Sequence, residues 1–261
     1  MIRCRLEGWL SGGRSAQVAM FSDFEEQCRH GADRIRDAVG ELPRGRPFHL
    51  ALSGGSTPGR LYELLALRDL PWDRVHVYLV DERLVPQDSP GSNYALVRER
   101  LLVHAPIPEA NVHAVPVTDS SAAQAAAEYE LSLASLPRGA GSGAPRFDLV
   151  LLGMGEDGHT GSLFPGSGAL AEIDRWAAGV TPEESPDGLS RVSLTLPVIN
   201  GADLVLVHIS GASKTKVLQR MLEGGAGQDL PISRVRPAGA MEWLLSPPLM
   251  RFALGSAEPF E

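Results

Sequence analysis

The chain has 261 residues, of which 43% are hydrophobic and 21% charged, and its 24 basic and 32 acidic residues give a formal net charge of −8. One α/β domain can bury a single core at this length, so we predict one domain over residues 1–261. No apolar run is long enough to cross a bilayer, and we expect no membrane-spanning segment. A negative chain without a basic stripe repels a polyanion, so we expect no nucleic-acid partner.

The first residues and the cysteines indicate the cellular compartment of the protein. The segment MIRCRLEGWLSGG (1–13) contains no apolar stretch of signal-peptide length, because Glu7 and Gly8 interrupt it. Cys4 and Cys28 form no CxxC pair and lie near no histidine cluster in the sequence, so neither a disulfide framework nor structural zinc is expected. We predict a cytoplasmic protein with reduced thiols and no metal.

Four short apolar segments predict buried strands of one sheet. Continuous apolar runs are typical of strands covered on both faces, and turn residues and a helix-like pattern follow them. This order predicts an α/β fold with a Rossmann-like open, mostly parallel sheet and helices on both faces. The segments are HLALS (49–53), VHVYLV (75–80), FDLVLLG (147–153) and DLVLVHIS (203–210).

Four helices are predicted around these strands. The first, over residues 22–39, begins with a capping-box pattern formed by Ser22 and Glu25. The other three cover residues 58–67, 93–103 and 121–136. Two segments rich in glycine and proline or in polar residues, 137–145 and 181–188, predict surface loops.

A turn rich in glycine and hydroxyl groups follows the first strand. The turn consists of Ser53, Gly54, Gly55, Ser56 and Thr57. It leads into a helix for which Thr57 would be the N-cap and Pro58 the first residue. The glycines let the backbone approach a ligand, and amides at a helix N-terminus favour an anion. We predict a phosphate-binding turn, with a purely structural strand-to-helix turn as the alternative.

Charged residues follow the second predicted strand. Asp81, Glu82 and Arg83 come just past its carboxyl end, which is the side on which open α/β sheets bind ligands. Such a cluster is also typical of exposed residues that form salt bridges with one another. Its position at the sheet edge makes Asp81 and Arg83 candidate site residues.

The segment FDLVLLGMGEDGHTGSLFPGS (147–167) contains the strongest local signal. Its glycines match the GxGxxG pattern of dinucleotide-binding turns, but Gly161 and Pro165 would end a helix almost at once, so we reject that interpretation. A glycine-supported loop remains, and it presents Asp157 and His159 at the carboxyl edge of the sheet. A histidine beside a carboxylate accepts a proton readily near neutral pH. We predict that this pair is catalytic.

Two further cations are candidates for binding an anion. Arg191 begins a β-prone stretch, and Lys214 follows the fourth predicted strand where a helix begins. GASKT (211–215) is close to a P-loop but lacks the glycine directly before the lysine, so nucleotide-triphosphate chemistry is not expected. Either residue alone is typical of an exposed surface charge. Together with the 53–57 turn, Arg191 and Lys214 predict a binding site for a phosphate monoester.

Taken in chain order, these motifs resemble the 6-phosphogluconolactonase family. The wider superfamily also contains glucosamine-6-phosphate deaminases and isomerases, which have a catalytic glutamate five residues after the histidine. Here that residue is Phe164, which favours the lactonase branch. The resemblance extends over residues 45–245 through SGGSTP (53–58), VDERLVP (80–86), SNY (92–94), GMGEDGHTGSLFPGS (153–167), the Arg191 stretch, GASK (211–214) and PISRVRP with WLL (231–245).

The resemblance implies hydrolysis of a phosphorylated sugar lactone, 6-phospho-D-glucono-1,5-lactone. In that reaction His159 would be the general base with Asp157 beside it, and the 53–57 turn, Arg191 and Lys214 would hold the 6-phosphate. Arg83 would add a cation, and Asp81 is assigned only to the substrate site. No metal or organic cofactor is implied, and we expect a monomer or a homodimer.

Two alternative functions remain at this point. The first is a deaminase or isomerase on the same fold. The second is a non-catalytic sugar-phosphate sensor, which would need an output module such as a helix-turn-helix. The residues before the first motif are not basic, so they do not favour a DNA-binding module of this kind.

Overall fold

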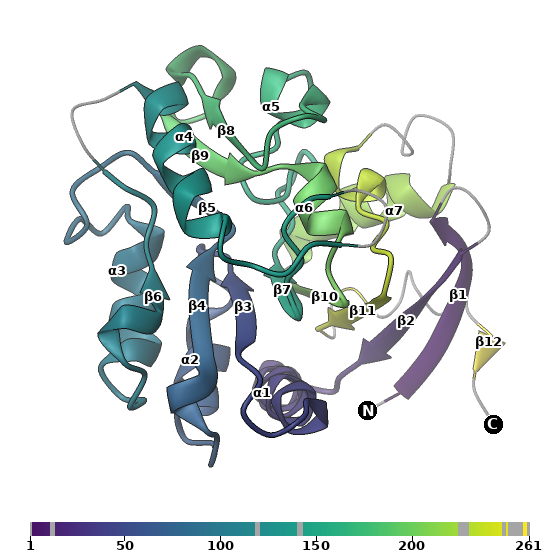
Figure 1. Ribbon diagram of the computed structural model, residues 1–261. Coiled ribbons are helices and arrows are strands. Elements are labelled where there is room, and N and C mark those ends of the chain that lie inside the picture. The colour runs from purple at the N-terminus through teal and green to yellow at the C-terminus, as the bar shows by residue number, and fades with distance from the viewer. Residues whose placement is uncertain are drawn as a thin grey trace.

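The computed structural model describes residues 2–10, 14–117, 121–139, 143–223, 230–246, 249 and 258–259, with the backbone alone described for 2–10, 14–16, 222–223 and 258–259. Within these residues the chain forms a nine-stranded sheet and a three-stranded sheet, with helices packed around them (Figure 1). In the same part of the chain, no helix has the length and apolarity needed to cross a membrane.

The large sheet is open and mostly parallel, as predicted. Its strands are β1 (Ile2–Leu10), β2 (Arg14–Met20), β3 (Phe48–Leu52), β4 (Val75–Leu79), β6 (Val112–His113), β7 (Leu149–Leu152), β10 (Leu204–Ile209), β11 (Ala240–Leu245) and β12 (Glu258–Pro259). Their order across the sheet is β12-β1-β2-β11-β10-β7-β3-β4-β6. Every neighbouring pair from β2 to β6 in this order is parallel, and β1 and β12 are added antiparallel at one edge.

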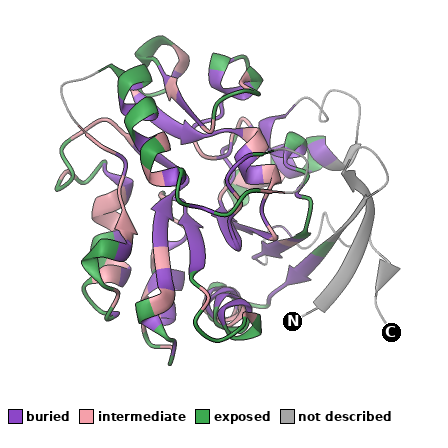
Figure 2. Cartoon of the chain, viewed as in Figure 1, coloured by how far each residue is buried: buried purple, intermediate pink, exposed green. Residues whose placement is uncertain are grey.

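Three of the four predicted apolar strands are buried along their whole length. Every residue of β3, β7 and β10 is buried, and Figure 2 shows these strands inside the layer of helices. Removing apolar side chains from water on both faces of a strand is the main driving force for this arrangement. The four predicted strands are therefore confirmed, with bounds that differ by one or two residues.

The helices are α1 (Phe24–Glu41), α2 (Gly59–Ala66), α3 (Asn93–Val97), α4 (Ala122–Leu133), α5 (Gly168–Ala171), α6 (Leu196–Asn200) and α7 (Thr215–Glu223). The four predicted helices correspond to α1, α2, α3 and α4, and α3 continues as a π-helical turn over Arg98–Leu102. Of the two predicted loops, 181–188 contains a 3-10 turn at Pro182–Glu184. Residues 140–142 of the other loop lie outside the described residues.

Two predicted helix caps are wrong by one residue. The N-cap of α1 is Asp23, whose carboxylate accepts a hydrogen bond from the Glu26 backbone at 2.7 Å, and Ser22 precedes it. Aspartate caps a helix as well as serine does, so the pattern allowed both positions. Helix α2 begins at Gly59 with Pro58 as its N-cap, which leaves Thr57 in the preceding turn.

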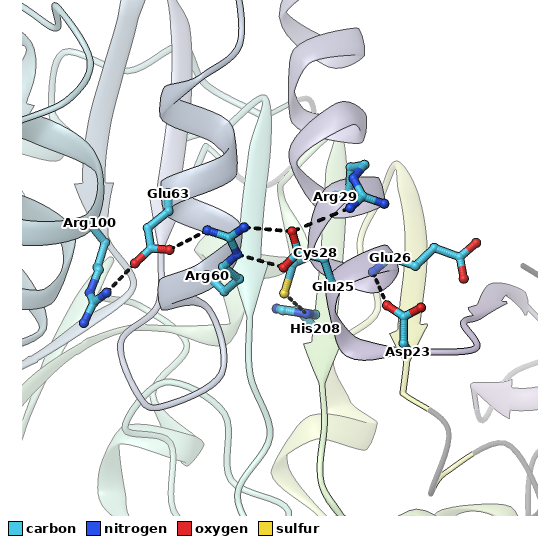
Figure 3. A network of polar contacts seen from close by, with 9 residues as sticks. All are labelled: Asp23, Glu25, Glu26, Cys28, Arg29, Arg60, Glu63, Arg100 and His208. Atoms are coloured by element: carbon cyan, nitrogen blue, oxygen red, sulfur yellow. Dashed lines mark hydrogen bonds and ion pairs between the residues drawn. The ribbon is translucent and has the colours of Figure 1, made fainter.

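Helices α1 and α2 pack closely because Gly31 has no side chain. A Cβ atom at Gly31 would lie 2.4 Å from Leu61 Cδ1, so only glycine allows this approach. An ion pair joins the same helices at the surface, where Arg60 donates to Glu25 at 2.8 Å, and Arg60 also donates to Glu63 within α2 at 2.8 Å (Figure 3). Exposed pairs of this kind contribute little to stability, so the apolar contact decides the packing.

The sequence does not predict the small antiparallel sheet. It consists of β5 (Asp81–Arg83), β8 (Ala177–Val180) and β9 (Arg191–Leu194), in the order β5-β9-β8. Its strands have three or four residues, too few to produce a clear periodic pattern. The chain leaves β4 and enters β5 after one residue, so β5 carries its charged side chains past the edge of the large sheet.

Candidate active site

The structure brings the predicted site residues together at the carboxyl edge of the large sheet. They line a pocket of about 200 Å³, together with Pro58, Asn93, Gly153, Met154, Gly155, Thr160 and Gly161. The predicted residues among the lining are Ser53, Gly54, Gly55, Ser56, Thr57, Asp81, Arg83, His159, Arg191 and Lys214. Asp157 is not part of the lining, but it is hydrogen-bonded to His159.

The 53–57 turn presents backbone donors to the pocket. Among the described residues, no hydrogen-bond partner is found for the backbone N–H groups of Gly54, Gly55, Ser56 or Thr57. Gly55 has a φ of +93°, a conformation that favours glycine. Unpaired amides ahead of a helix are suited to an anion, so the geometry supports the predicted phosphate site.

The Ser53 hydroxyl positions the turn. It donates to the Leu151 carbonyl at 2.8 Å, and this bond ties the end of β3 to β7. The Tyr62 hydroxyl of α2 donates to the Ser53 carbonyl from the other side. Because its hydroxyl proton is already donated, Ser53 holds the turn in place. The hydroxyls of the exposed Ser56 and the half-buried Thr57 remain the candidates for a ligand.

Asp157 orients the His159 ring through two hydrogen bonds. Asp157 Oδ1 lies 2.6 Å from His159 Nδ1 and accepts the His159 backbone N–H at 3.1 Å. Burial acts to raise the pKa of Asp157, but the bonds from His159 outweigh it and the net pKa is lowered. An ionised carboxylate accepts a proton-bearing Nδ1, which leaves the Nε2 lone pair available as a base.

Glycines make room for this pair. A Cβ atom at Gly155 would lie 2.1 Å from His159 Nδ1, so any side chain there would displace the His159 ring. Gly158 turns the loop with a φ of +85°, and its carbonyl accepts the Ile232 N–H at 2.9 Å. The segment that follows residue 230 therefore supports the His159 loop from behind.

Phe164 separates the base from the candidate phosphate-binding arginine. Its ring centroid lies 4.7 Å from that of His159, and the Arg191 guanidinium carbon lies 5.4 Å from the same ring. Phe164 is only 3% exposed, so it forms an apolar wall between the two groups.

Asn93 connects the charged residues of β5, and sequence reasoning missed it. Its amide nitrogen donates to Asp81, to the carbonyl at 2.8 Å and to the carboxylate at 3.2 Å, while its oxygen accepts from Arg83 at 2.6 Å. Ser162 donates to the other Asp81 oxygen at 2.6 Å. A Cβ atom at Gly54 would lie 1.8 Å from Asn93 Oδ1, so this glycine also serves to admit Asn93.

Glu82 serves the fold and does not line the pocket. It is fully buried and accepts the backbone N–H groups of Asn93 and Tyr94, both at 2.7 Å, at the start of α3. Burial raises its pKa, and these hydrogen bonds oppose the rise. The middle residue of the Asp-Glu-Arg cluster thus anchors the helix that supplies Asn93.

Arg191 is held by two residues of the preceding loop. Its Nε donates to Ser185 Oγ at 3.0 Å, and its Nη2 is paired with Asp187. The hydrogen bond from Arg191 lowers the pKa of Asp187 well below its usual range. Neither Ser185 nor Asp187 was recognisable from the sequence, because the 181–188 segment has the composition of an ordinary loop.

Lys214 approaches the pocket from a third element. It ends a 3-10 turn at Ala212–Lys214, directly ahead of α7, after Gly211 with a φ of +95°. In the part of the chain that is described, no group of three or more His, Cys, Asp or Glu side chains is arranged to hold a metal ion.

Comparisons with known proteins agree with this geometry. A family model described as glucosamine-6-phosphate isomerases/6-phosphogluconolactonase matches residues 22–243. A 6-phosphogluconolactonase of Nostoc sp. is 42% identical over 76% of this chain and 81% of its own length. A 6-phosphogluconolactonase of Synechocystis sp. is 41% identical over 81% of this chain and 86% of its own.

Solved structures of 6-phosphogluconolactonases also match this chain. The crystal structure of 6-phosphogluconolactonase from Thermotoga maritima has a TM-score of 0.75 at 31% identity and covers 88% of this chain and 99% of that one. The 6-phosphogluconolactonase of Trypanosoma brucei has a TM-score of 0.77 at 30% identity, with 90% and 97% covered. A monomeric glucosamine-6-phosphate deaminase shares the fold at 21% identity with a TM-score of 0.74. The chain belongs to the glucosamine-6-phosphate isomerase/6-phosphogluconolactonase family.

Proposed function

We propose that this protein hydrolyses 6-phospho-D-glucono-1,5-lactone to 6-phosphogluconate, the second step of the oxidative pentose phosphate pathway. One observation carries the proposal: the His159 imidazole and the anion-binding turn at residues 53–57 line the same pocket. The substrate needs both, a base near its carbonyl and donors for its phosphate. The lactonases that are 41–42% identical to this chain support the same reaction.

The phosphate anchors the sugar. It carries between one and two negative charges near neutral pH, and the 53–57 amides, Arg191 and Lys214 converge on one pocket where these charges can be neutralised. Holding the phosphate places the C1 carbonyl of the lactone over His159. The reaction then gains from positioning, since base, water and carbonyl are kept in one geometry.

His159 acts as the general base. Its Nε2 takes a proton from water, and the hydroxide oxygen bonds to C1 to form a tetrahedral intermediate. Asp157, which holds Nδ1, stabilises the imidazolium that results. Backbone amides of the glycine loops or one of the arginines stabilise the oxyanion. The imidazolium then returns the proton to the ring oxygen as the C1–O bond breaks, giving the open-chain acid.

Phe164 favours this reaction over sugar deamination. A deaminase of this superfamily is expected to have a glutamate at this position, and here the side chain is apolar, buried and packed against His159. The pocket therefore lacks that carboxylate for proton transfer.

We further infer a cytoplasmic, single-domain enzyme that works without a cofactor, as a monomer or a homodimer. The buried free thiol of Cys28 supports a reducing compartment. The large sheet takes strands from both ends of the described chain, which supports one folding unit.

Proton release on adding freshly made 6-phosphogluconolactone tests the proposal. We expect rapid turnover of this substrate, slow turnover of unphosphorylated gluconolactone, and no ammonia from glucosamine 6-phosphate. His159→Ala is expected to lose most turnover and keep its affinity for inorganic phosphate. Equal rates on both lactones would contradict the phosphate anchor, and ammonia release would favour the deaminase reaction.

A further inference from the structure

We propose that His76 and His113 form a binding site for a divalent transition-metal ion at the amino-terminal edge of the large sheet, away from the active site. Three of the seven histidines of the chain, His49, His76 and His113, line a second cavity of about 350 Å³ there. Arg46, Pro47, Ser135 and Pro137 complete its lining.

Strand register gathers these histidines on one face. His49 of β3 lies opposite His76 of β4, and Tyr78 of β4 lies opposite His113 of β6. Residues two apart on a strand share a face, so His76 and Tyr78 bring all three imidazoles to the same side. These three strands are neighbours at the β6 edge of the sheet (Figure 1).

The distance between two ring nitrogens suits a shared ion. His76 Nδ1 and His113 Nε2 are 3.1 Å apart, and both residues are half-buried. Two nitrogens bound to one zinc ion at about 2.0–2.1 Å lie about 2.9 Å apart at a right angle and about 3.4 Å apart in a tetrahedron. The observed distance falls between these values, so small ring rotations suffice.

Within the described part of the chain, the cavity lining carries no uncompensated charge that would oppose a cation. Its one basic side chain among the described residues, Arg46, is paired with the buried Asp148 at 2.7 Å. Neutral imidazoles then dominate the lining, and their lone pairs are the donors that Zn²⁺, Ni²⁺ and Cu²⁺ prefer. His49 adds a third imidazole, 92% buried, whose Nδ1 has no hydrogen-bond partner among the described residues.

The site has two protein ligands and completes its coordination with water. No three-ligand group is preformed within the described residues, which distinguishes it from a structural zinc site. The two facing nitrogens share a proton in a hydrogen bond, so the donor ring must change tautomer when the ion binds. Each ring then binds as the neutral form, with its remaining proton on the nitrogen that faces away from the ion. A bound ion would link β4 to β6, which pair over only two residue positions, Val77 with Val112 and Tyr78 with His113. Metal binding should therefore stabilise this edge and leave the distant reaction unchanged.

Isothermal titration calorimetry of the whole protein with Zn²⁺, at pH 7.5 and without chelators, tests the site. We expect one equivalent bound by the unmodified chain, and a Tm raised by about 5–10 °C when free Zn²⁺ is about 100-fold above its Kd. His113→Phe, which keeps an aromatic ring stacked on Tyr78 at a centroid distance of 4.2 Å, should weaken binding at least about 10-fold. His76→Asn should do the same.

His104→Gln is the matched control, because His104 is exposed and does not line the cavity. It should bind Zn²⁺ like the unmodified chain. Zinc binding that persists in His113→Phe would place the ion elsewhere and overturn the proposal, as would an unmodified chain that binds none. Should His76→Asn fail to fold by near-UV circular dichroism, Cu²⁺ electron paramagnetic resonance of the unmodified chain decides, since the site requires two nitrogen donors.

Discussion

Arg83 and Arg191 lie directly opposite each other in the antiparallel pair of β5 and β9, and both line the candidate active site. Like charges in this position destabilise a strand pair. Arg191 is only 6% exposed, so water screens its charge little. Asp187 pairs with Arg191, and Asp81 lines the pocket, so two carboxylates face the three cations Arg83, Arg191 and Lys214. In the function proposed above, the substrate phosphate would add the negative charge that this set lacks.

Replacing Arg191 should therefore weaken phosphate binding selectively. For Arg191→Gln we expect KM for the phosphorylated lactone to rise about 10- to 100-fold, because hydrogen bonds to a charged group contribute about 1.5–3 kcal/mol. The rate on unphosphorylated gluconolactone should not change. Steady-state kinetics on both lactones measure this, with Arg175→Gln as a control at an arginine that pairs with Glu130 outside the pocket. A parallel loss on both substrates would show that Arg191 serves the fold alone.

Gly155→Ala should disconnect Asp157 from His159 without unfolding the protein. The new methyl group would overlap His159 Nδ1 and Asp157 Oδ1, so the ring must leave its position. Loss of general-base catalysis predicts a fall in kcat of about 10²- to 10⁴-fold. Gly40→Ala is the control, because a Cβ atom there meets nothing within 4 Å. Full activity of Gly155→Ala would mean that the Asp157 contact is unimportant.

Asn93→Ala should affect both stability and substrate binding. It removes the partner of Asp81 and Arg83, and an unsatisfied buried polar group costs about 1–3 kcal/mol in the free energy of unfolding. Because Arg83 loses its orientation, we also expect a raised KM. Ser92→Ala separates the two effects, since Ser92 caps α3 through Ala95 and does not line the pocket. Urea unfolding should show a loss in both variants, and KM should rise only in Asn93→Ala.

The buried His208 should make stability depend on pH. Burial lowers the pKa of His208 to about 4, whereas an unfolded histidine has a pKa of about 6.5. As the pH falls, His208 is therefore protonated at a higher pH in the unfolded chain than in the native protein. The free energy of unfolding should fall by roughly 3 kcal/mol from this group as the pH drops from about 6.5 to 4. Cys28 Sγ lies 3.9 Å from His208 Nε2 (Figure 3). The Phe24 ring stacks on His208.

His208→Phe removes this titration and keeps the ring contact with Phe24. The difference in the free energy of unfolding between pH 7.5 and pH 4.5, measured with urea, should be smaller in the variant. Comparing the two proteins cancels the other groups that titrate over this range. An identical pH dependence would mean that His208 takes up its proton over the same pH range in the native and the unfolded chain.

The glycine and strand patterns predicted the core of the fold and most of the site because they are local. A buried parallel strand appears as an uninterrupted apolar run, and its carboxyl end identifies the edge where ligands bind. The 53–57 turn and the His159 loop follow such strands directly, so their meeting at one edge followed from the topology. The helix caps were less certain, since Ser22 and Asp23 are adjacent residues with the same capping ability.

What only the tertiary structure decided is how the charged residues are held. Asn93 joins Asp81 to Arg83, and Asp187 joins Arg191, through contacts that no short pattern encodes. The β5–β9 pair connects segments more than a hundred residues apart through strands of three and four residues. Strands this short have too few side chains to specify a register by themselves, so packing against α3 and α4 places Arg83 opposite Arg191. By itself, the sequence determined which chemical groups reach the pocket; long-range packing determined their orientation within it.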